Sequence, residues 1–206
     1  DLASFWQAIA KEFSTFKNIY GYGLMNEPHD LAPETKWFDM AQASINAIRE
    51  VDTNTLIMVG GNDWSSAERW IEQSDTLKFL KDPANNLAFE AHVYFDKDAS
   101  GTYKYSYEEE ECYPEKGIDR VKPFVEWIKQ NKFHGFIGEY GIPDNDPRWN
   151  ETLDLFLGYL QENGINGTYW AAGPWWDTYF MAITPKDGKD RPQMPIIEKY
   201  TSTFKK

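Results

Sequence analysis

Two glutamates follow apolar, glycine-containing runs that are typical of buried strands. Glu27 follows the run 19–25 and precedes Pro28, which cannot continue a central strand because it lacks a backbone N–H. Glu139 follows the run 136–138 and precedes Gly141. Hydrolysis of a glycosidic bond needs two carboxyl groups, because one must protonate the leaving oxygen while the other attacks or stabilises the anomeric carbon. The two glutamates are therefore the first candidates for catalysis.

Strand and helix patterns alternate along the chain, and the strand patterns are apolar throughout. The predicted strands are residues 19–25, 55–60, 87–95, 135–140 and 168–173. The predicted helices are residues 2–17, 37–48, 121–128, 152–162 and 195–201. Continuous apolar strands separated by helices predict a parallel sheet covered by helices.

Chemically useful side chains stand at the C-terminal ends of these strands. They are Asn26, Glu27, Trp64, His92, Tyr94, Glu139 and Trp170. Strands that send such side chains to one face are typical of a (β/α)8 barrel, whereas a doubly wound sheet binds its ligand at one switch point. A whole barrel has eight strands and about 250 residues. Five strands in 206 residues therefore predict an α/β fold that is part of a (β/α)8 TIM barrel.

The composition excludes several functional classes. A net charge of −12 argues against nucleic acid, whose phosphates need a basic surface. No apolar run reaches about 18 residues, so no membrane span is expected. Cys112 is the only cysteine, and the three histidines lack ligand spacing, so we expect no disulfide, no metal and no cofactor. The chain begins with Asp1 rather than Met, which leaves its compartment open.

Aromatic residues make up 17% of the chain, with nine Trp and twelve Tyr. They could form a large core or stacking platforms for flat ligands such as sugars, and both interpretations stay open. At helical positions, Trp6, Trp37 and Trp127 are expected in the core. His29 is interpreted as a loop residue and His134 as a turn residue. The acidic run 108–111 lies in a long polar loop and is interpreted as a solvated surface.

Several of these motifs together resemble glycoside hydrolase family 5, most closely its subfamily 5 endo-β-1,4-glucanases. They are Asn26-Glu27-Pro28, the stretch 61–67, His92-Val-Tyr94 with the loop that follows, Gly138-Glu139-Tyr-Gly141 and Trp170-Ala-Ala-Gly-Pro-Trp175-Trp176. The resemblance runs from the family's third helix to its last helix, so its strands 4–8 have counterparts and its strands 1–3 do not. Residues 1–206 are thus expected to be a single C-terminal portion of a catalytic barrel.

The resemblance implies a role for each site residue. It makes Glu27 the acid/base and Glu139 the nucleophile of a retaining, endo-acting hydrolase of β-1,4-glucan. It places Tyr94 in contact with Glu139 and makes His92 an orienting residue. The remaining implied substrate-binding residues are Asn26 at the sugar 2-hydroxyl and Trp64 and Trp170 as stacking platforms, with Trp175 and Trp176 as weaker candidates.

Other outcomes remain open at this level. A truncated barrel could be weakly active or bind glucan without turnover, and family 5 also includes mannanases and other β-glycanases. Because an open sheet exposes strand edges, we expect either a homo-oligomer or pairing with a complementary N-terminal segment. The family resemblance further implies a secreted protein that acts on a β-glucan polysaccharide or oligosaccharide.

Overall fold

The computed structural model of this chain describes residues 1–31 and 35–201. The strands are β1 (Gly21–Gly23), β2 (Leu56–Gly60), β3 (Leu87–His92), β4 (His134–Tyr140) and β5 (Asn166–Tyr169). The main helices are α1 (Leu2–Phe13), α2 (Thr35–Arg49), α5 (Lys116–Asn131), α6 (Arg148–Glu162) and α7 (Met194–Tyr200). Shorter helical segments are α3 (Asn62–Ser65), α4 (Trp70–Ser74), η1 (Asp75–Phe79) and η2 (Pro174–Trp176). Within the described ranges, no helix has the length and apolarity needed to cross a membrane.

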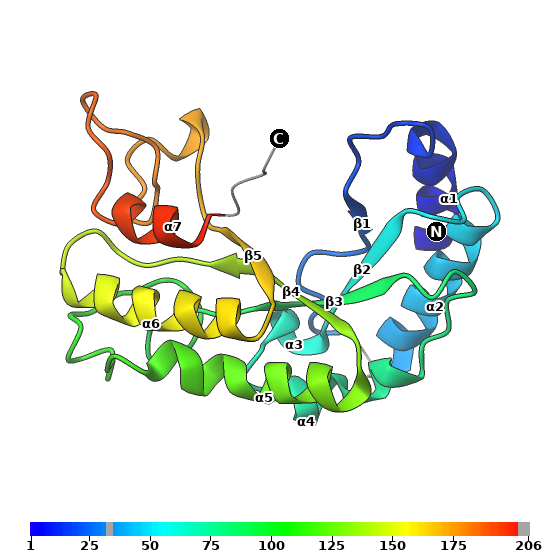
Figure 1. The fold of residues 1–206 in the computed structure, drawn as a ribbon. Coiled ribbons are helices and arrows are strands. Elements are labelled where there is room, and N and C mark those ends of the chain that lie inside the picture. Colours follow the sequence, from blue (N-terminus) through cyan, green and yellow to red (C-terminus); the bar gives the residue numbers. More distant parts are fainter. Residues whose placement is uncertain (32–34, 202–206) are drawn as a thin grey trace. The chain divides into compact units, whose positions relative to one another are not determined.

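The five strands form one sheet in the order β1-β2-β3-β4-β5 (Figure 1). β1 and β2 are parallel, with Gly21 opposite Leu56, and β2 and β3 are parallel, with Ile57 opposite Leu87. Strands that follow one another in both sequence and sheet, with helices between them, are the repeating unit of a (β/α)8 barrel. The structure thus confirms the predicted fold class, an α/β partial barrel of five strands.

The chain folds into two compact units. The first comprises Asp1–Ala91 with Pro123–Phe136, and the second comprises His92–Lys122 with the residues from Ile137 onwards.

Aromatic side chains from several elements fill the core of the first unit. The ring centroid of Trp70 lies 4.6 Å from Phe124 and 5.5 Å from Trp127. The indole N–H of Trp127 donates to Asp75 (2.8 Å), and that of Trp37 donates to the Gly60 carbonyl (2.8 Å). Buried indoles therefore keep a hydrogen-bond partner at their polar edge. The predicted core positions of Trp37 and Trp127 are confirmed.

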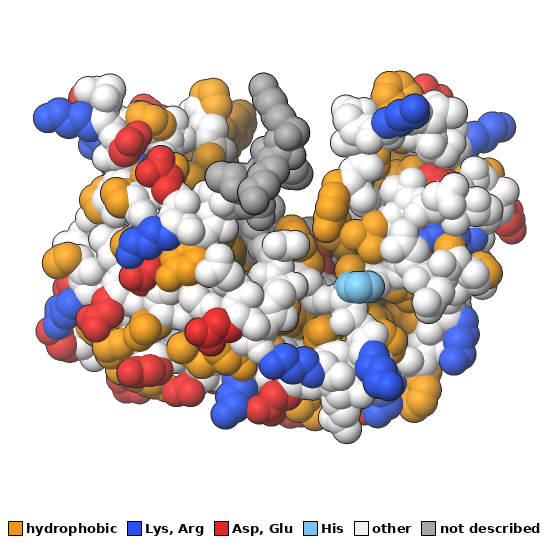
Figure 2. All heavy atoms as spheres, in the orientation of Figure 1, with side chains coloured by type: hydrophobic (Ala, Val, Ile, Leu, Met, Phe, Trp, Pro, Cys, Tyr) orange, Lys and Arg blue, Asp and Glu red, His pale blue; other side chains and the backbone are white. Residues whose placement is uncertain are grey.

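The N-terminal helix departs from its prediction. α1 ends at Phe13, whereas the apolar spacing predicted a helix to residue 17. Only Ala10 is fully buried where α1 packs on α2, and Trp6 is half-buried. Phe5 and Phe16 stay 55% and 51% exposed, so the amphipathic pattern identified a face that neighbouring described residues leave uncovered. Figure 2 shows such apolar side chains at the surface among charged ones.

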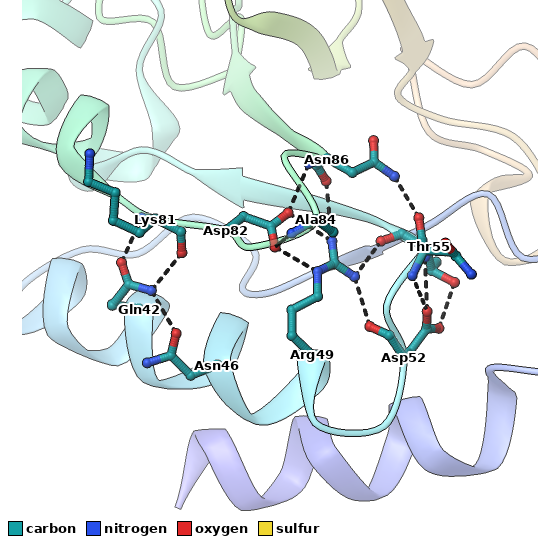
Figure 3. Close-up of polar contacts among 10 residues, drawn as sticks. Gln42, Asn46, Arg49, Asp52, Thr55, Lys81, Asp82, Ala84 and Asn86 are labelled. Carbon is teal, nitrogen blue, oxygen red and sulfur yellow. Dashed lines mark hydrogen bonds and ion pairs between the residues drawn. The ribbon is translucent and has the colours of Figure 1, made fainter.

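A buried ion pair fixes the turns around β2 and β3 (Figure 3). Nε and Nη2 of Arg49 donate to the two carboxylate oxygens of Asp82 at 2.7 and 3.0 Å. Nη1 of Arg49 donates to the backbone carbonyls of Asp52 and Thr55. Both charged side chains are almost fully buried, so loss of either partner would leave an uncompensated buried charge.

Asp52 holds the turn between α2 and β2. Its carboxylate accepts the backbone N–H groups of Asn54 and Thr55, the Thr55 hydroxyl and the Tyr22 hydroxyl. Burial alone would raise the pKa of this carboxyl group, but the hydrogen bonds from Thr55, Asn54 and Tyr22 outweigh it and lower the pKa to about 2. The ionised form of Asp52 is therefore part of the folded structure.

The long loop of the second unit is ordered by two buried carboxylates. Asp96 accepts the backbone N–H groups of Gly101 and Thr102, each at 3.0 Å. Glu110, only 3% exposed, accepts the N–H groups of Lys97 and Tyr105. The interpretation of the whole acidic run as a solvated surface is thus wrong for Glu110, because the loop folds over it.

Candidate active site

The predicted site residues fall into two groups, one in each unit. The first unit contains Asn26, Glu27 and Trp64, and the second contains His92, Tyr94, Glu139 and Trp170. Each group lies at the C-terminal ends of strands, as the sequence predicted.

In the first unit, Glu27 stands just beyond β1. Parallel pairing continues one residue past the strand, because Leu24 N–H donates to the Met58 carbonyl at 3.1 Å. The chain then turns, and Glu27 adopts a left-handed backbone conformation with φ of 43°. Non-glycine residues adopt this conformation rarely, and it concentrates at functional sites. Glu27 is half-buried and Asn26 is exposed.

Trp64 follows β2 on a tight left-handed turn. Asp63, Trp64 and Ser65 all have positive φ, between 55° and 56°. The backbone N–H of Trp64 donates to the carbonyl of Pro28 at 3.3 Å. This hydrogen bond joins the turn to the residue after Glu27. Trp64 remains 43% exposed, as a stacking platform requires.

In the second unit, two side chains converge on Glu139 at the end of β4. The Tyr94 hydroxyl donates to Oε2 of Glu139 at 2.6 Å, and Nδ1 of His92 lies 3.7 Å from the same oxygen. The backbone holds them in register, because Val93 N–H donates to the Glu139 carbonyl at 3.0 Å. The contact between Tyr94 and Glu139 that the sequence implied is therefore present.

Tyr94 acts as a hydrogen-bond donor in this arrangement. Burial, together with the charge and hydrogen bond of Glu139, raises the pKa of Tyr94 far above its ordinary value. The phenol stays protonated at any physiological pH, and its hydrogen points to the carboxylate. His92 and Glu139 each carry an atom that could bind a metal ion, and Oε2 of Glu139 also accepts the Tyr94 hydrogen bond.

Trp170 lies one residue beyond β5, whereas the sequence predicted that this strand continues to residue 173. Its backbone N–H donates to the Tyr140 carbonyl at 2.8 Å. Its ring packs edge-on against that of Trp176, with ring centroids 5.0 Å apart. If any other residue replaced Gly141, its Cβ would lie only 2.4 Å from the Trp170 carbonyl oxygen. Gly141 therefore allows the residues after β4 and β5 to approach each other closely.

Two further residues near these groups were not among the site residues predicted from the sequence, although His29 was correctly interpreted as a loop residue. His29 stacks on Trp64, with ring centroids 4.6 Å apart and planes 12° apart. Tyr103 donates its hydroxyl hydrogen to the Gly141 carbonyl (2.6 Å) and accepts the Phe95 N–H (2.9 Å). The only sequence signal for His29 was its position two residues after Glu27, and Tyr103 gave none.

The cellulase model of glycosyl hydrolase family 5 matches residues 1–175 of this chain. The chain belongs to this family. Its sequence is 36% identical to endo-beta-1,4-glucanase B of Emericella nidulans over 193 residues, which are 91% of this chain and 56% of that protein.

Solved structures of family 5 enzymes have the same fold. Endoglucanase Cel5A of Pseudomonas stutzeri, crystallised with cellobiose, is 43% identical with a TM-score of 0.91 over 98% of this chain and 60% of that one. XacCel5A, crystallised with cellopentaose, is 38% identical with a TM-score of 0.87 over 97% of this chain and 65% of that one. The chain thus spans less than two thirds of each of these three family 5 proteins.

Proposed function

We propose that this family 5 chain hydrolyses internal β-1,4 bonds of glucan with retention of configuration. The observation that carries the proposal is the Tyr94–Glu139 hydrogen bond at the end of β4, in a chain whose relatives are endo-β-1,4-glucanases. A carboxylate held by a neutral phenol in a half-buried position is suited to act as an oriented nucleophile. Glu139 takes this role, and Glu27 is the acid/base.

In the first step, a carboxylate oxygen of Glu139 forms a bond to the anomeric carbon as the bond to the leaving oxygen breaks. Glu27 gives its proton to that leaving oxygen. In the second step, ionised Glu27 takes a proton from water, the water oxygen bonds to the anomeric carbon, and Glu139 leaves as a carboxylate. Retention by this route requires the carboxyl groups to be about 5–5.5 Å apart, where mutual repulsion favours one proton on the pair.

The other site residues bind the sugar. Asn26 is proposed to hydrogen-bond the 2-hydroxyl of the sugar at the cleaved bond. Trp64 and Trp170 offer apolar faces to pyranose rings, and His92 orients Glu139. Relatives crystallised with cellobiose and cellopentaose support a β-1,4-linked glucose chain as the substrate class.

Release of reducing sugar from carboxymethylcellulose tests this function, with the Glu139→Gln variant as the control. Turnover that the variant loses supports the enzyme. Pull-down on insoluble glucan without any turnover would instead assign a binding module. A parallel panel of mannan, xyloglucan and lichenan tests the substrate class, and cleavage of mannan alone would contradict it.

We also propose that another polypeptide segment covers the β1 side of the first unit, either from a second copy or from a complementary segment. β1 is an outer strand of the described sheet, and Tyr20 beside it is 67% exposed. Exposed strand edges and apolar side chains favour association. A stable monomer in size-exclusion chromatography at micromolar concentration would contradict association of this chain with itself.

We further propose that the protein is secreted, because a β-1,4-glucan polymer outside the cell is too large to cross the cell membrane. Fractionation of a producing culture tests this, since the protein should be in the medium rather than in the cell pellet.

A further inference from the structure

The imidazole of His29 covers one face of the Trp64 indole. The rings are stacked with centroids 4.6 Å apart and planes 12° apart. Nδ1 of His29 also lies 2.9 Å from Oδ2 of Asp30, in a contact between two exposed side chains. All three residues belong to the first unit, at the ends of β1 and β2.

The backbone brings these rings together independently of the stacking. Trp64 N–H donates to the Pro28 carbonyl, which precedes His29 directly. A Cβ on Gly60 would lie 3.1 Å from the Met25 carbonyl oxygen and 3.4 Å from Cδ of Pro28, so the residues after β1 pack closely on the end of β2. The backbone therefore sets the distance between the two residues, and stacking sets the orientation of one ring against the other.

Trp64 needs such a partner because of the turn that carries it. Its backbone is left-handed (φ 55°, ψ 33°), as is that of Asp63 before it (φ 56°, ψ 59°). A side chain on this turn lacks the neighbouring helical turn that would restrict its rotamer in a regular helix. With 43% of the residue exposed, an indole without a stacked neighbour would sample several rotamers.

We propose that His29 is a positioning residue for Trp64, and this rests on the glucanase function proposed above. The imidazole holds the indole in one orientation and covers one face, so that a pyranose ring stacks on the opposite face. An indole fixed before binding loses less rotamer freedom when the sugar arrives. The stack between His29 and Trp64 should therefore strengthen the binding of the glucan chain without changing the rate of the chemical step. The reason is that His29 stacks equally on Trp64 in the ground and transition states.

Cellopentaose affinity, measured by calorimetry in a Glu139→Gln background that blocks turnover, tests the proposal. His29→Ala should raise the Kd about two- to tenfold, the range expected for one aromatic stack. His29→Phe, which keeps a flat ring, should bind within about twofold of the parent. Adding His29→Ala to Trp64→Ala should have no further effect. Unchanged affinity in His29→Ala, affinity in His29→Phe as weak as in His29→Ala, or additive effects would overturn the assignment.

Fluorine NMR of the chain labelled with 5-fluorotryptophan monitors the environment of the Trp64 ring in the absence of sugar. The Trp64 resonance is the one that disappears in Trp64→Phe. His29→Ala should shift and broaden it while the other tryptophan resonances stay in place, and His29→Phe should keep it narrow. An unmoved Trp64 resonance in His29→Ala would overturn the positioning role. Failure of the parent to bind cellopentaose would overturn the glucanase function too, whereas binding that ignores His29 would overturn only this inference.

Discussion

The two groups of site residues are held in different ways. Glu139 ends a regular strand and is oriented by side chains, with the Tyr94 hydroxyl at 2.6 Å and His92 at 3.7 Å. Glu27 stands on an irregular turn, where its φ of 43° and the backbone bond between Trp64 and Pro28 fix the path of the chain. A nucleophile needs its charge and direction controlled, whereas an acid/base must alternate between protonated and ionised forms. In the proposed roles, the Tyr94 hydroxyl directs the carboxylate of Glu139, and the left-handed turn sets where Glu27 stands beyond β1.

The largest expected effects separate the two glutamates. Glu139→Gln should lower kcat on cellopentaose by about 10³-fold or more, because no covalent intermediate can form. Glu27→Gln should lower it by about 10²–10⁴-fold, the usual contribution of a general acid. An aryl cellobioside with a dinitrophenolate leaving group distinguishes them, since that leaving group needs no proton.

On the aryl substrate, the Glu27 variant should therefore retain its first step and show a burst of dinitrophenolate. The Glu139 variant should show neither burst nor turnover. A burst from the Glu139 variant would reverse the assigned roles.

Glycine substitutions compare how tightly the backbone is packed in the two units. Gly141→Ala should destabilise the protein by about 3 kcal/mol, since the new Cβ would lie 2.4 Å from the rigid Trp170 carbonyl oxygen. Gly60→Ala should cost about 1–2 kcal/mol, because its closest contact, at 2.9 Å, is the rotatable Ser65 hydroxyl. Gly158→Ala in α6 is the matched control and should be neutral or stabilise by up to about 1 kcal/mol. Urea unfolding measures all three, and equal losses at Gly141 and Gly158 would contradict the packing.

Tyr94→Phe tests whether the Glu139 group depends on its side-chain donor. Loss of a hydrogen bond to a carboxylate should lower kcat about ten- to fiftyfold, with little change in Tm. Tyr103→Phe should instead lower Tm with little change in kcat. It removes the hydrogen bonds of the Tyr103 hydroxyl to the Gly141 carbonyl and the Phe95 N–H. Steady-state kinetics with parallel thermal melts separates these outcomes, and an unchanged kcat in Tyr94→Phe would argue against an oriented nucleophile.

The first unit should show its own dependence on pH through Asp52. Its folded-state pKa of about 2 lies below the unfolded value of about 3.9, so ionised Asp52 stabilises the fold above pH 4. That contribution, about 2 kcal/mol, is lost as the pH falls from 4 towards 2. The difference in unfolding free energy between the parent and Asp52→Asn should therefore shrink by about 2 kcal/mol between pH 5 and pH 2. A constant difference across this range would contradict the lowered pKa.

The sequence predicted two strands closely, because the apolar runs 55–60 and 135–140 coincide with β2 and β4. It misplaced the bounds of the strands predicted at 19–25 and 168–173, since β1 covers only Gly21–Gly23 and β5 is Asn166–Tyr169. The strand pattern placed Tyr94 and Glu139 near strand ends, but the contact between them was predicted from the resemblance to glycoside hydrolase family 5. It erred where tertiary packing decides. The apolar face of 2–17 indicated a buried helix, but the helix ends at Phe13 and Phe16 is exposed. The contact between His29 and Trp64 joins residues 35 positions apart through left-handed turns, which no periodicity encodes.

Trapping of a covalent intermediate tests the central claim most directly. The chain is incubated with a 2-deoxy-2-fluoro cellobioside that carries a dinitrophenolate leaving group, because the fluorine slows both steps while the reactive leaving group keeps the first step fast. Peptide mass spectrometry should then find one fluorocellobiosyl group, attached to Glu139 and absent from the Glu139→Gln variant. A label on another residue, or turnover of cellopentaose by a chain whose Glu139 is never labelled, would contradict the proposed nucleophile.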